Sequence, residues 1–370
     1  MARKQNSTRN ARVTSQIKQL CCLGLGPHAI APPLTRLLLH MIPAYSSTVF
    51  FCDDGGELIN IYDENPALIE VGPVYVNEFH NRRETDVWTG FKETFQRGLV
   101  GMMVEELVKV DRRTWKRSGM YNEVFRPLGY DGGLRLAVRD RGRPLCGIAV
   151  SRGEDEHEFA KQDLDLLISL EPYFSHAFDL PLGPSPLTES DADEDQGLIL
   201  ADREGRIRYL SRQARVLLFY ATNEDVAPGK LQAGKQELPP RIAQLARSLV
   251  DVFEGDAPAA PPTYCQKNNW GEFVFRAYWL NGRGARSPLI AIRINRREPL
   301  PVRLLRRMEQ LPLSERQMEV SLHLVSGKTY KEIAERLGVS RPTVIYHAQE
   351  VFNKLGVASR AELQAKLMTL

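Results

Sequence analysis

The stretch that decides the C-terminal fold is KEIAERLGVSRPTVIYHAQEVFNKL, residues 331–355, which contains two helical patterns with a short break between them. Gly338, Val339 and Ser340 lie in the break, and a proline follows at position 342. A corner of this kind either closes an ordinary helical bundle or presents its second helix to a partner outside the protein. The residues on each side of the break favour the second interpretation.

Local start and stop signals predict four helices between residues 313 and 370. Three capping boxes start helices, and Ser340 is a good N-cap for a further one. These boxes are Ser314-x-x-Gln317, Thr329-x-x-Glu332 and Ser359-x-x-Glu362. Gly327, Gly338 and Gly356 stand where the first three helices must end, because a left-handed residue is easiest without a Cβ.

The third of these helices has two dissimilar faces when its residues are placed at 100° intervals. The apolar stripe consists of Val344, Ala348, Val351 and Leu355, and it must pack on the first two helices. The opposite face carries Pro342, Tyr346, Gln349 and Asn353, with Ile345 at its edge. Amides hydrogen-bond adenine edges in the major groove and apolar groups contact the thymine methyl, so this face suits DNA better than water. Ala334 is small enough to let the second helix cross the third closely.

The charge distribution supports a polyanion partner for the same segment. Residues 296–370 contain 13 Lys and Arg against 8 Asp and Glu, whereas the whole chain has a net charge of only +3. Lys331, Arg341 and Lys354 would supply phosphate contacts, together with the amides at the helix N-terminus. Surface charge that serves only solubility would look similar.

A set of residues spread over 313–367 carries a resemblance to a known family. The set is Glu319-Val320, Gly327, Lys331-Glu332-Ile333-Ala334, Leu337, Ser340, Thr343-Val344, His347 and Lys354-Leu355-Gly356-Val357. With these residues at this spacing, the segment resembles the LuxR-type helix-turn-helix DNA-binding domain. It departs from that pattern at Ser321 and His323, which replace residues that are usually apolar, so we expect the first helix to pack more loosely or to meet another domain.

The resemblance implies roles for individual residues. Ile345, Tyr346 and Gln349 would face the bases. The phosphate contacts would come from Lys331, Ser340, Arg341, Thr343, His347 and Lys354. The last helix often forms the dimer contact in this family, which here would use Leu363, Leu367 and Leu370.

Composition places the chain among globular proteins without a membrane span. It has 370 residues, of which 43% are hydrophobic and 26% charged, and it contains no run of about 18 apolar residues. The first 12 residues, MARKQNSTRNAR, have no apolar core, so we expect a frayed tail rather than a secretory signal. Five scattered cysteines form no CxxC pair, which predicts reduced thiols and a cytoplasmic protein.

Two linkers predict the domain organisation. The first, residues 181–196, combines prolines with an acidic run and is expected to be flexible. The second, residues 296–312, is expected to be a connector helix with Val302, Leu305 and Met308 on one face. The domains are then 1–180, 197–295 and 313–370.

The front two-thirds of the chain favours an α+β multidomain protein with two antiparallel sheets, followed by the all-α C-terminal domain. In the first domain, STVFFCDD and ELINIYD predict one hairpin, and LRLAVRD and PLCGIAV predict another across residues 140–143. A mostly helical, aromatic-rich region is expected over about 84–125 and one amphipathic helix over 159–178. The middle domain is expected to contain a hairpin in GLILADREGRIRYLS, a helix over 241–254, and the strands EFVFRAYWL and PLIAIRI joined by NGRGARS.

Two weaker resemblances suggest what these domains do. Residues 121–178, beginning YNEVFRPLGYDGGLRLAV, look like the end of a GAF-like sensor, and GLILADREGRIRYLSRQARVLL resembles the start of a PAS-like domain. Five aromatic residues either line a pocket for a small molecule or simply form core. They are Trp88, Phe91, Phe95, Trp115 and Tyr121. No residue pattern indicates a metal or another cofactor.

Other functions fit the sequence less well. A phosphorylated receiver is excluded, because Asp53 is the first acidic residue and no acidic pair precedes it to hold Mg²⁺. An acyl-homoserine-lactone receptor remains an alternative, although its ligand-binding set does not map onto Trp88, Trp115 and Tyr121. A signalling or scaffold protein whose C-terminal helices bind a protein partner is another. No catalytic pair or phosphate loop indicates an enzyme.

The sequence therefore predicts a bacterial transcription regulator whose sensor domains respond to a small-molecule effector. We expect a homodimer on a pseudo-palindromic double-stranded DNA site, since one short helix reads too few base pairs. RNA polymerase would be a further partner if the regulator is an activator.

Overall fold

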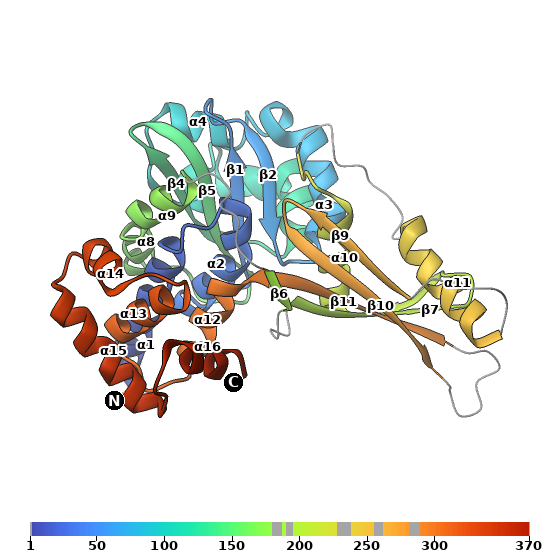
Figure 1. Cartoon of the computed structure of the whole chain (residues 1–370). Helices are drawn as coiled ribbons and strands as arrows, with labels where there is room; N and C mark the ends of the chain where they lie inside the picture. Colours follow the sequence, from blue (N-terminus) through green and yellow to red (C-terminus); the bar gives the residue numbers. More distant parts are fainter. Residues whose placement is uncertain are drawn as a thin grey trace.

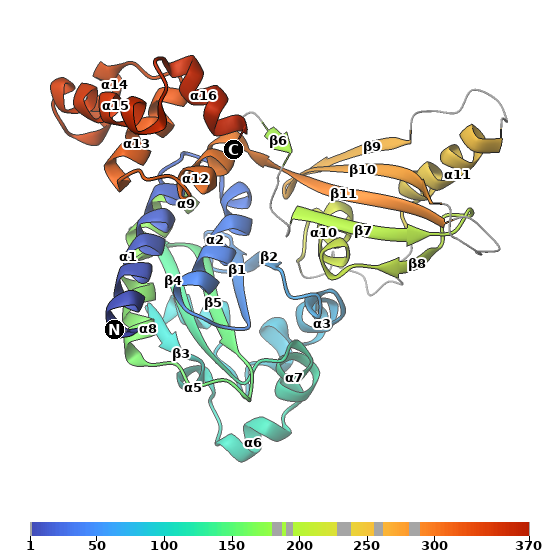
Figure 2. The same ribbon diagram turned by 90° about the horizontal axis from the view of Figure 1, so that it is seen from below.

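In the part of the chain that the structure describes, two antiparallel sheets precede a C-terminal bundle of helices (Figures 1 and 2). This computed structural model describes residues 2–179, 187–189, 195–227, 238–254, 262–280 and 289–369. The predicted α+β class with two antiparallel sheets and a helical C-terminus is confirmed. No helix among the described residues has both the length and the apolar character needed to cross a bilayer.

Within the described residues, the first sheet has five strands in the order β2-β1-β5-β4-β3. They are β1 Ser46–Cys52, β2 Leu58–Asp63, β3 Gly101–Met103, β4 Gly132–Asp140 and β5 Arg143–Arg152. Both predicted hairpins are confirmed. In the first turn the Asp53 carboxylate accepts hydrogen bonds from the N–H groups of Gly55 and Glu57. In the second, Arg141 and Gly142 both have positive φ, as the twist of a two-residue hairpin requires.

One face of this sheet is covered by longer helices, which are α1 Ala2–Cys21, α2 Pro27–Met41, α8 Lys161–Ile168 and α9 Glu171–Phe178. Phe51 of β1 points to this side, where its ring lies 4.4 Å from the His28 ring and 5.9 Å from the Phe178 ring. The prediction of a single helix over 159–178 is wrong, because two helices occupy this range. The chain breaks between α8 and α9, because Pro172 lacks an N–H and belongs in the first turn of a new helix.

The N-terminal segment differs from the expected frayed tail, because α1 begins at Ala2 and runs on to Cys21. Val13, Ile17 and Leu20 are buried at the i, i+4, i+7 spacing of an amphipathic helix. They pack toward α2 and α9, which α1 contacts. The basic, polar start of the chain hid this pattern.

The other face of the first sheet carries short helical segments. These are α3 Leu68–Val74, η1 Tyr75–Arg83, α4 Phe91–Gln96, α5 Val104–Leu107, α6 Arg112–Arg117, η2 Met120–Phe125 and α7 Arg126–Leu128. The Phe50 ring points to this side and lies 4.4 Å from the Phe91 ring. Gly147 permits that approach, since a Cβ there would stand 2.7 Å from Phe91. The helical region expected over 84–125 is only partly correct, because strand β3 and loops interrupt it.

The second sheet has six strands among the described residues. Five follow the order β8-β7-β11-β10-β9, and β6 pairs with the end of β11. The strands are β6 Leu187–Glu189, β7 Gln196–Ala201, β8 Ile207–Leu210, β9 Thr263–Asn268, β10 Gly271–Leu280 and β11 Leu289–Pro299, with helices α10 Arg212–Thr222 and α11 Pro240–Glu254. The predicted hairpin, helix and paired strands are confirmed. The NGRGARS joint lies outside the described residues.

Part of the expected flexible linker 181–196 is ordered. Leu187–Glu189 forms β6, and Asp195 is buried just before β7. The remainder of the linker lies outside the described residues, apart from Gln196, with which β7 begins. Pairing with a distant strand leaves no local pattern, so β6 could not be predicted from its own residues.

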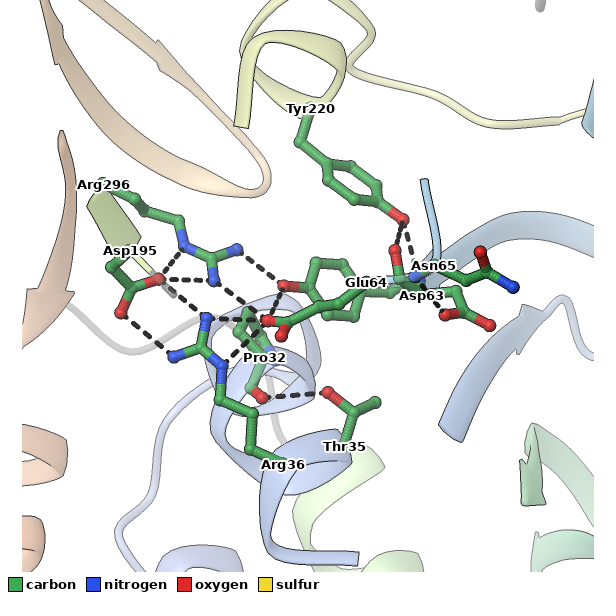
Figure 3. A network of polar contacts seen from close by, with 10 residues as sticks. Pro32, Thr35, Arg36, Asp63, Glu64, Asn65, Asp195, Tyr220 and Arg296 are labelled. Atoms are coloured by element: carbon green, nitrogen blue, oxygen red, sulfur yellow. Dashed lines mark hydrogen bonds and ion pairs between the residues drawn. The ribbon is translucent and has the colours of Figure 1, made fainter. Parts of the chain in front are cut away.

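A buried polar network joins the two sheet units (Figure 3). Arg36 of α2 binds Asp195 with two hydrogen bonds of 3.1 and 2.9 Å, and its Nε donates to Glu64 at 2.9 Å. Arg296 of β11 donates from Nε and Nη2 to Asp195 Oδ1, at 2.8 and 2.6 Å, and Arg36 Nη2 donates to that same oxygen. Nearby, the Tyr220 hydroxyl accepts from the Asp63 N–H and donates to the Asp63 carbonyl. One carboxylate thus bridges two arginines from different units.

Helix α12 Leu300–Met308 follows β11 directly and leads to the bundle. The three residues expected on its inner face, Val302, Leu305 and Met308, are all buried. The bundle consists of α13 Glu315–Val325, α14 Tyr330–Leu337, α15 Arg341–Leu355 and α16 Arg360–Thr369. It lies beside α1 and α12 in both views (Figures 1 and 2).

Candidate functional site

The corner between α14 and α15 is built from local capping interactions. Thr329 and Glu332 form the predicted capping box, and Gly338 ends α14 with φ 63°. Ser340 caps α15 by accepting a hydrogen bond from the Thr343 N–H, and their two hydroxyl oxygens lie 2.7 Å apart. The path of α15 away from α14 is therefore fixed by its own residues.

The inner stripe of α15 anchors the helix in the bundle as expected. Val344, Ala348 and Val351 are fully buried and Leu355 is 4% exposed. They pack against α13 and α14, where Ile333 is also fully buried. This anchoring leaves the other side of α15 facing outward.

The outward face of α15 is open along its length. Tyr346 is 59% exposed, which is unusual for so large an apolar side chain, and Ile345 is half-buried at the edge. The remaining exposed residues on this side are Arg341, Pro342, Gln349 and Asn353. The structure thus brings the three predicted base-reading residues, Ile345, Tyr346 and Gln349, to one side of a protruding helix.

The predicted phosphate contacts have dissimilar surroundings. Lys331 is exposed and lies 4.0 Å from Glu335, and Arg341 is exposed at the start of α15. His347 is half-buried, and its Nδ1 has no hydrogen-bond partner among the described residues. Lys354 Nζ donates to the Pro312 carbonyl at 3.0 Å and to Gln317 Oε1 at 2.9 Å, so two of its three donors are engaged inside the bundle. Its phosphate contact stays a prediction.

The predicted dimer contact needs a correction. Leu363 and Leu367 of α16 are fully buried inside the bundle, where α16 contacts α12 and α13. They have no surface to offer a second copy, because their spacing places them on the inner side of α16. Leu370 lies outside the described residues. A contact through this helix would have to use its exposed residues instead.

The first helix of the bundle meets another unit. Gln19 of α1 donates from Nε2 to the Glu315 carbonyl at the start of α13, at 3.4 Å. Ser321 is fully buried, and its hydroxyl donates to the Gln317 carbonyl within α13. Burial, followed by the nearby Arg336, lowers the pKa of the half-buried His323. The sequence predicted that α13 would either pack more loosely or meet another domain. The hydrogen bond from Gln19 agrees with the second of these predictions.

The five aromatic residues considered for a ligand pocket are mostly core. All are buried, with exposed fractions between 1% for Trp88 and 8% for Phe95. The Trp115 ring lies 5.6 Å from Trp88 and 5.9 Å from Tyr121. A cavity of about 70 Å³ does lie beside this cluster, but of the five only Trp88 lines it. Sequence reasoning missed Arg135, which also lines the cavity. The sequence feature that could have revealed Arg135 is its position as the one charged residue in the otherwise apolar run LRLAV, residues 134–138.

Comparisons with known proteins agree with the geometry of the bundle. Residues 311–366 match the family described as "Bacterial regulatory proteins, luxR family". The chain is 43% identical over 53 residues to the Fimbriae Z protein of Salmonella typhimurium, and 45% identical over 49 residues to the probable transcriptional regulatory protein SgaR of Hyphomicrobium methylovorum. These matches cover 14% and 13% of this chain and 25% and 23% of the relatives, so the chain spans about a quarter of their length.

Similarity to solved structures is weaker. The phage VqmA–DPO complex is 19% identical with a TM-score of 0.19, and covers 48% of this chain and 84% of that chain. The E. coli DhaR(N)–DhaL complex is 10% identical with a TM-score of 0.26, and covers 79% of this chain and 90% of that chain. The family match, by contrast, identifies the C-terminal segment of this chain as a LuxR-type helix-turn-helix domain.

Proposed function

We propose that this protein is a sequence-specific DNA-binding transcription regulator and not an enzyme. The observation that carries the proposal is the open face of α15, where Tyr346 and Gln349 are exposed on a LuxR-type helix-turn-helix domain. An α-helix fits the major groove, where an amide can bond adenine and an apolar group can contact the thymine methyl. Arg341 at the start of the helix adds a phosphate contact.

The regulator acts as a homodimer on DNA. One helix of this length reads only a few base pairs, so two copies on a pseudo-palindromic site with half-sites about one helical turn apart would supply the specificity. DNA as the partner places its action in the bacterial cytoplasm, with RNA polymerase as a further partner if it activates transcription.

The two sheet units are the sensor. With strands numbered from the first long strand of each, both sheets have the order 2-1-5-4-3, which supports related GAF-like and PAS-like modules. The second sheet leads directly into α12, and α12 contacts both α1 and α16. An effector that binds one arrangement of these units more tightly than another would shift the fraction of chains able to bind DNA.

In vitro selection from genomic fragments tests the proposal. The full-length protein is compared at physiological salt with the Arg341→Ala/Tyr346→Ala double variant. We expect the wild type alone to recover a two-fold-symmetric motif. Recovery of random fragments only, with and without small-molecule extracts from cells, would contradict the proposal and favour a protein partner for α15.

A further inference from the structure

The second sheet has one face covered by helices. Gly197 of β7 lies against α10, because a Cβ there would stand 2.4 Å from the Ala214 Cα. On β10, the Trp279 ring stacks on the Phe253 ring of α11 with centroids 4.6 Å apart. Side chains alternate between the two faces of a strand, so the residues next to Gly197 and Trp279 point to the opposite side of the sheet.

That opposite side carries a row of paired residues across four adjacent strands. Tyr209 of β8 pairs with Leu200 of β7. Across the next two strands, Leu200 pairs with Ala291 of β11, which pairs with Tyr278 of β10 (Figure 2). Residues directly opposite one another on antiparallel strands share a face. Tyr209 is 68% exposed and Tyr278 is 46% exposed, so both ends of the row stand in solvent.

Two flanking rows extend this surface along the strands. On one side, Leu198 is 47% exposed and pairs with Arg293. The Arg293 Nη2 donates to Gln196 Oε1 at 2.8 Å, which directs the guanidinium along the sheet toward β7. On the other side, Leu280 is 40% exposed and pairs with Leu289. Of the ten large apolar side chains exposed in the described residues, four therefore lie on this one surface.

We call this surface the open face, formed by Leu198, Leu200, Tyr209, Tyr278, Leu280 and Ala291. Four strands about 4.8 Å apart and three rows about 6.8 Å apart occupy about 19 by 20 Å. A helix is about 10–12 Å across with its side chains, so it would cover only about half of this width. A second sheet would cover all of it, since sheets pack face to face.

The size of the open face also fits a protein interface. Its flat area is about 400 Å², and pleated strands with projecting tyrosines expose more than the flat area. A standard interface takes about 800 Å² of accessible surface from each partner, and roughly 60% of that surface is apolar. The open face can thus supply the apolar centre, with Arg293 beside it. Tyrosine and arginine are both enriched in interfaces.

The position of the open face suits the pairing of two copies. Strand β11 carries Ala291 on this face and then leads directly into α12 and the bundle. The expected dimer contact is not available, because Leu363 and Leu367 of α16 are buried. The need for two chains rests on the proposed function, in which one short helix reads too few base pairs.

We propose that the open face is the homodimer interface and that it packs against the same face of a second copy. Contact between like faces gives a closed two-fold dimer. Its symmetry matches that of a pseudo-palindromic DNA site. Because β11 continues into α12, pairing of the two sheets sets the distance between the two bundles.

Sedimentation equilibrium of the full-length protein without DNA tests the proposal. Leu198→Glu places a charge on the open face. Ile59→Glu is the matched control, because Ile59 is also 47% exposed but lies on β2 of the first sheet. We expect wild type and Ile59→Glu to be dimers at micromolar concentrations. Leu198→Glu should dimerise at least about a hundredfold more weakly, since it buries two like charges in one interface.

A second variant keeps the test decisive if Leu198→Glu fails to fold, which thermal unfolding reveals. Tyr209→Ser removes a ring that is 68% exposed, so it leaves no cavity in the core. It should weaken dimerisation about tenfold, because buried tyrosines carry much of the binding energy of an interface.

Oxidative footprinting of the wild type needs no variant. Hydroxyl radicals label exposed tyrosines, and labelling is compared above and below the concentration at which the dimer dissociates. Labelling of Tyr209 and Tyr278 should fall several-fold in the dimer. Tyr45 is the internal control, since it is 47% exposed in the first unit and should be labelled equally in both states.

Three results would overturn the proposal: a wild type that stays monomeric, dimerisation of Leu198→Glu and Tyr209→Ser equal to that of wild type, or unchanged labelling of both tyrosines. Failure of the proposed function gives a different pattern. A dimer that depends on Leu198 but recovers no DNA motif keeps the interface and removes DNA as the partner. A recovered motif with a dimer that ignores Leu198 and Tyr209 keeps DNA binding and removes the open face.

Discussion

Arg341 and Lys354 carry the same charge near opposite ends of α15, but their surroundings give them different roles. Arg341 is exposed and makes no hydrogen bond or ion pair within the described residues. Lys354 holds Pro312 and Gln317, which join the end of α15 to the start of α13. Sequence alone treats the two as equal phosphate contacts, because the partner of a long flexible side chain depends on tertiary structure.

Replacing Arg341 by Ala should weaken binding to every DNA sequence. Removing one phosphate contact reduces the magnitude of the slope of log K against log salt by roughly 0.9. Binding titrations over a series of salt concentrations measure this slope, and thermal stability should stay unchanged. An unaltered salt slope would remove Arg341 from the phosphate contacts.

Replacing Lys354 by Met should instead loosen the bundle. The loss of two hydrogen bonds from a partly exposed ammonium is expected to cost about 1 kcal/mol of local stability. Hydrogen exchange of the α15 and α16 amides in the full-length protein reports this change. Normal protection combined with a reduced salt slope would return Lys354 to the phosphate contacts.

At the scale of elements, the turn between α14 and α15 depends on the backbone of Gly338. Its φ is 63°, and a Cβ there would meet nothing within 4 Å, so the requirement is conformational and not one of space. Gly338→Ala should cost about 1–2 kcal/mol, since a Cβ disfavours the left-handed region. Gly338→Asn should cost less. Hydrogen exchange across α14 and α15 compares the two, and equal protection in Gly338→Ala and wild type would contradict the assigned role.

Elements specified by neighbouring residues are the ones that can be predicted from the sequence. The capping boxes and Gly338 place the bundle helices, and alternating strands with short turns place both hairpins of the first sheet. Helix α1 was not predicted, because its buried apolar residues come only after a basic, polar start that is typical of a frayed tail. A single helix over 159–178 overlooks Pro172, whose missing N–H starts a new helix.

The parts that depend on distant contacts are beyond a local pattern. Asp195 lies in an acidic run that resembles a linker, yet it is buried between arginines that lie far away in the sequence. The burial of Arg135 becomes visible only once strand and helix pack together. Burial of Leu363 and Leu367 likewise follows from packing against α12 and α13.

For the whole molecule, the Asp195 network should hold the two sheet units together. Burial alone would raise the pKa of Asp195, but Arg296 and Arg36 beside it hold that pKa below its usual value. Asp195→Asn leaves both arginines with Glu64 as their remaining anionic neighbour and should cost about 3 kcal/mol. Urea unfolding of the full-length protein measures this, with exposed Asp155→Asn as the control.

The pH dependence of that effect has a definite sign. Because the folded pKa is lowered, the stability is present above about pH 4 and is lost as pH falls further. The difference between wild type and Asp195→Asn should therefore be constant between about pH 5 and pH 9. A difference that disappears within this range would contradict the ionised network.

Glu309, at the end of α12, should make stability depend on pH in the opposite direction. Burial raises its pKa to about 7, against the pull of Arg12 and Arg306. As pH rises from about 4.5 to 7, the unfolded chain loses a proton that the folded chain keeps, so this group lowers the free energy of unfolding by at most about 1.4 kcal/mol per pH unit. Glu309→Gln should be more stable than wild type near pH 8 and equal to it near pH 4. Denaturation at both pH values tests this, and equal stability at the higher pH would contradict it.

The central claim is that the exposed face of α15 reads bases, and one comparison of binding free energies tests it most directly. Wild type, Tyr346→Ala, Gln349→Ala and the control Gln364→Ala, an exposed residue of α16, are each titrated with the selected site and with a scrambled duplex of equal length. We predict a loss of about 1–3 kcal/mol on the selected site for each α15 variant, with binding to the scrambled duplex nearly unchanged. Equal losses on both duplexes, or no loss on either, would show that this face does not read the sequence.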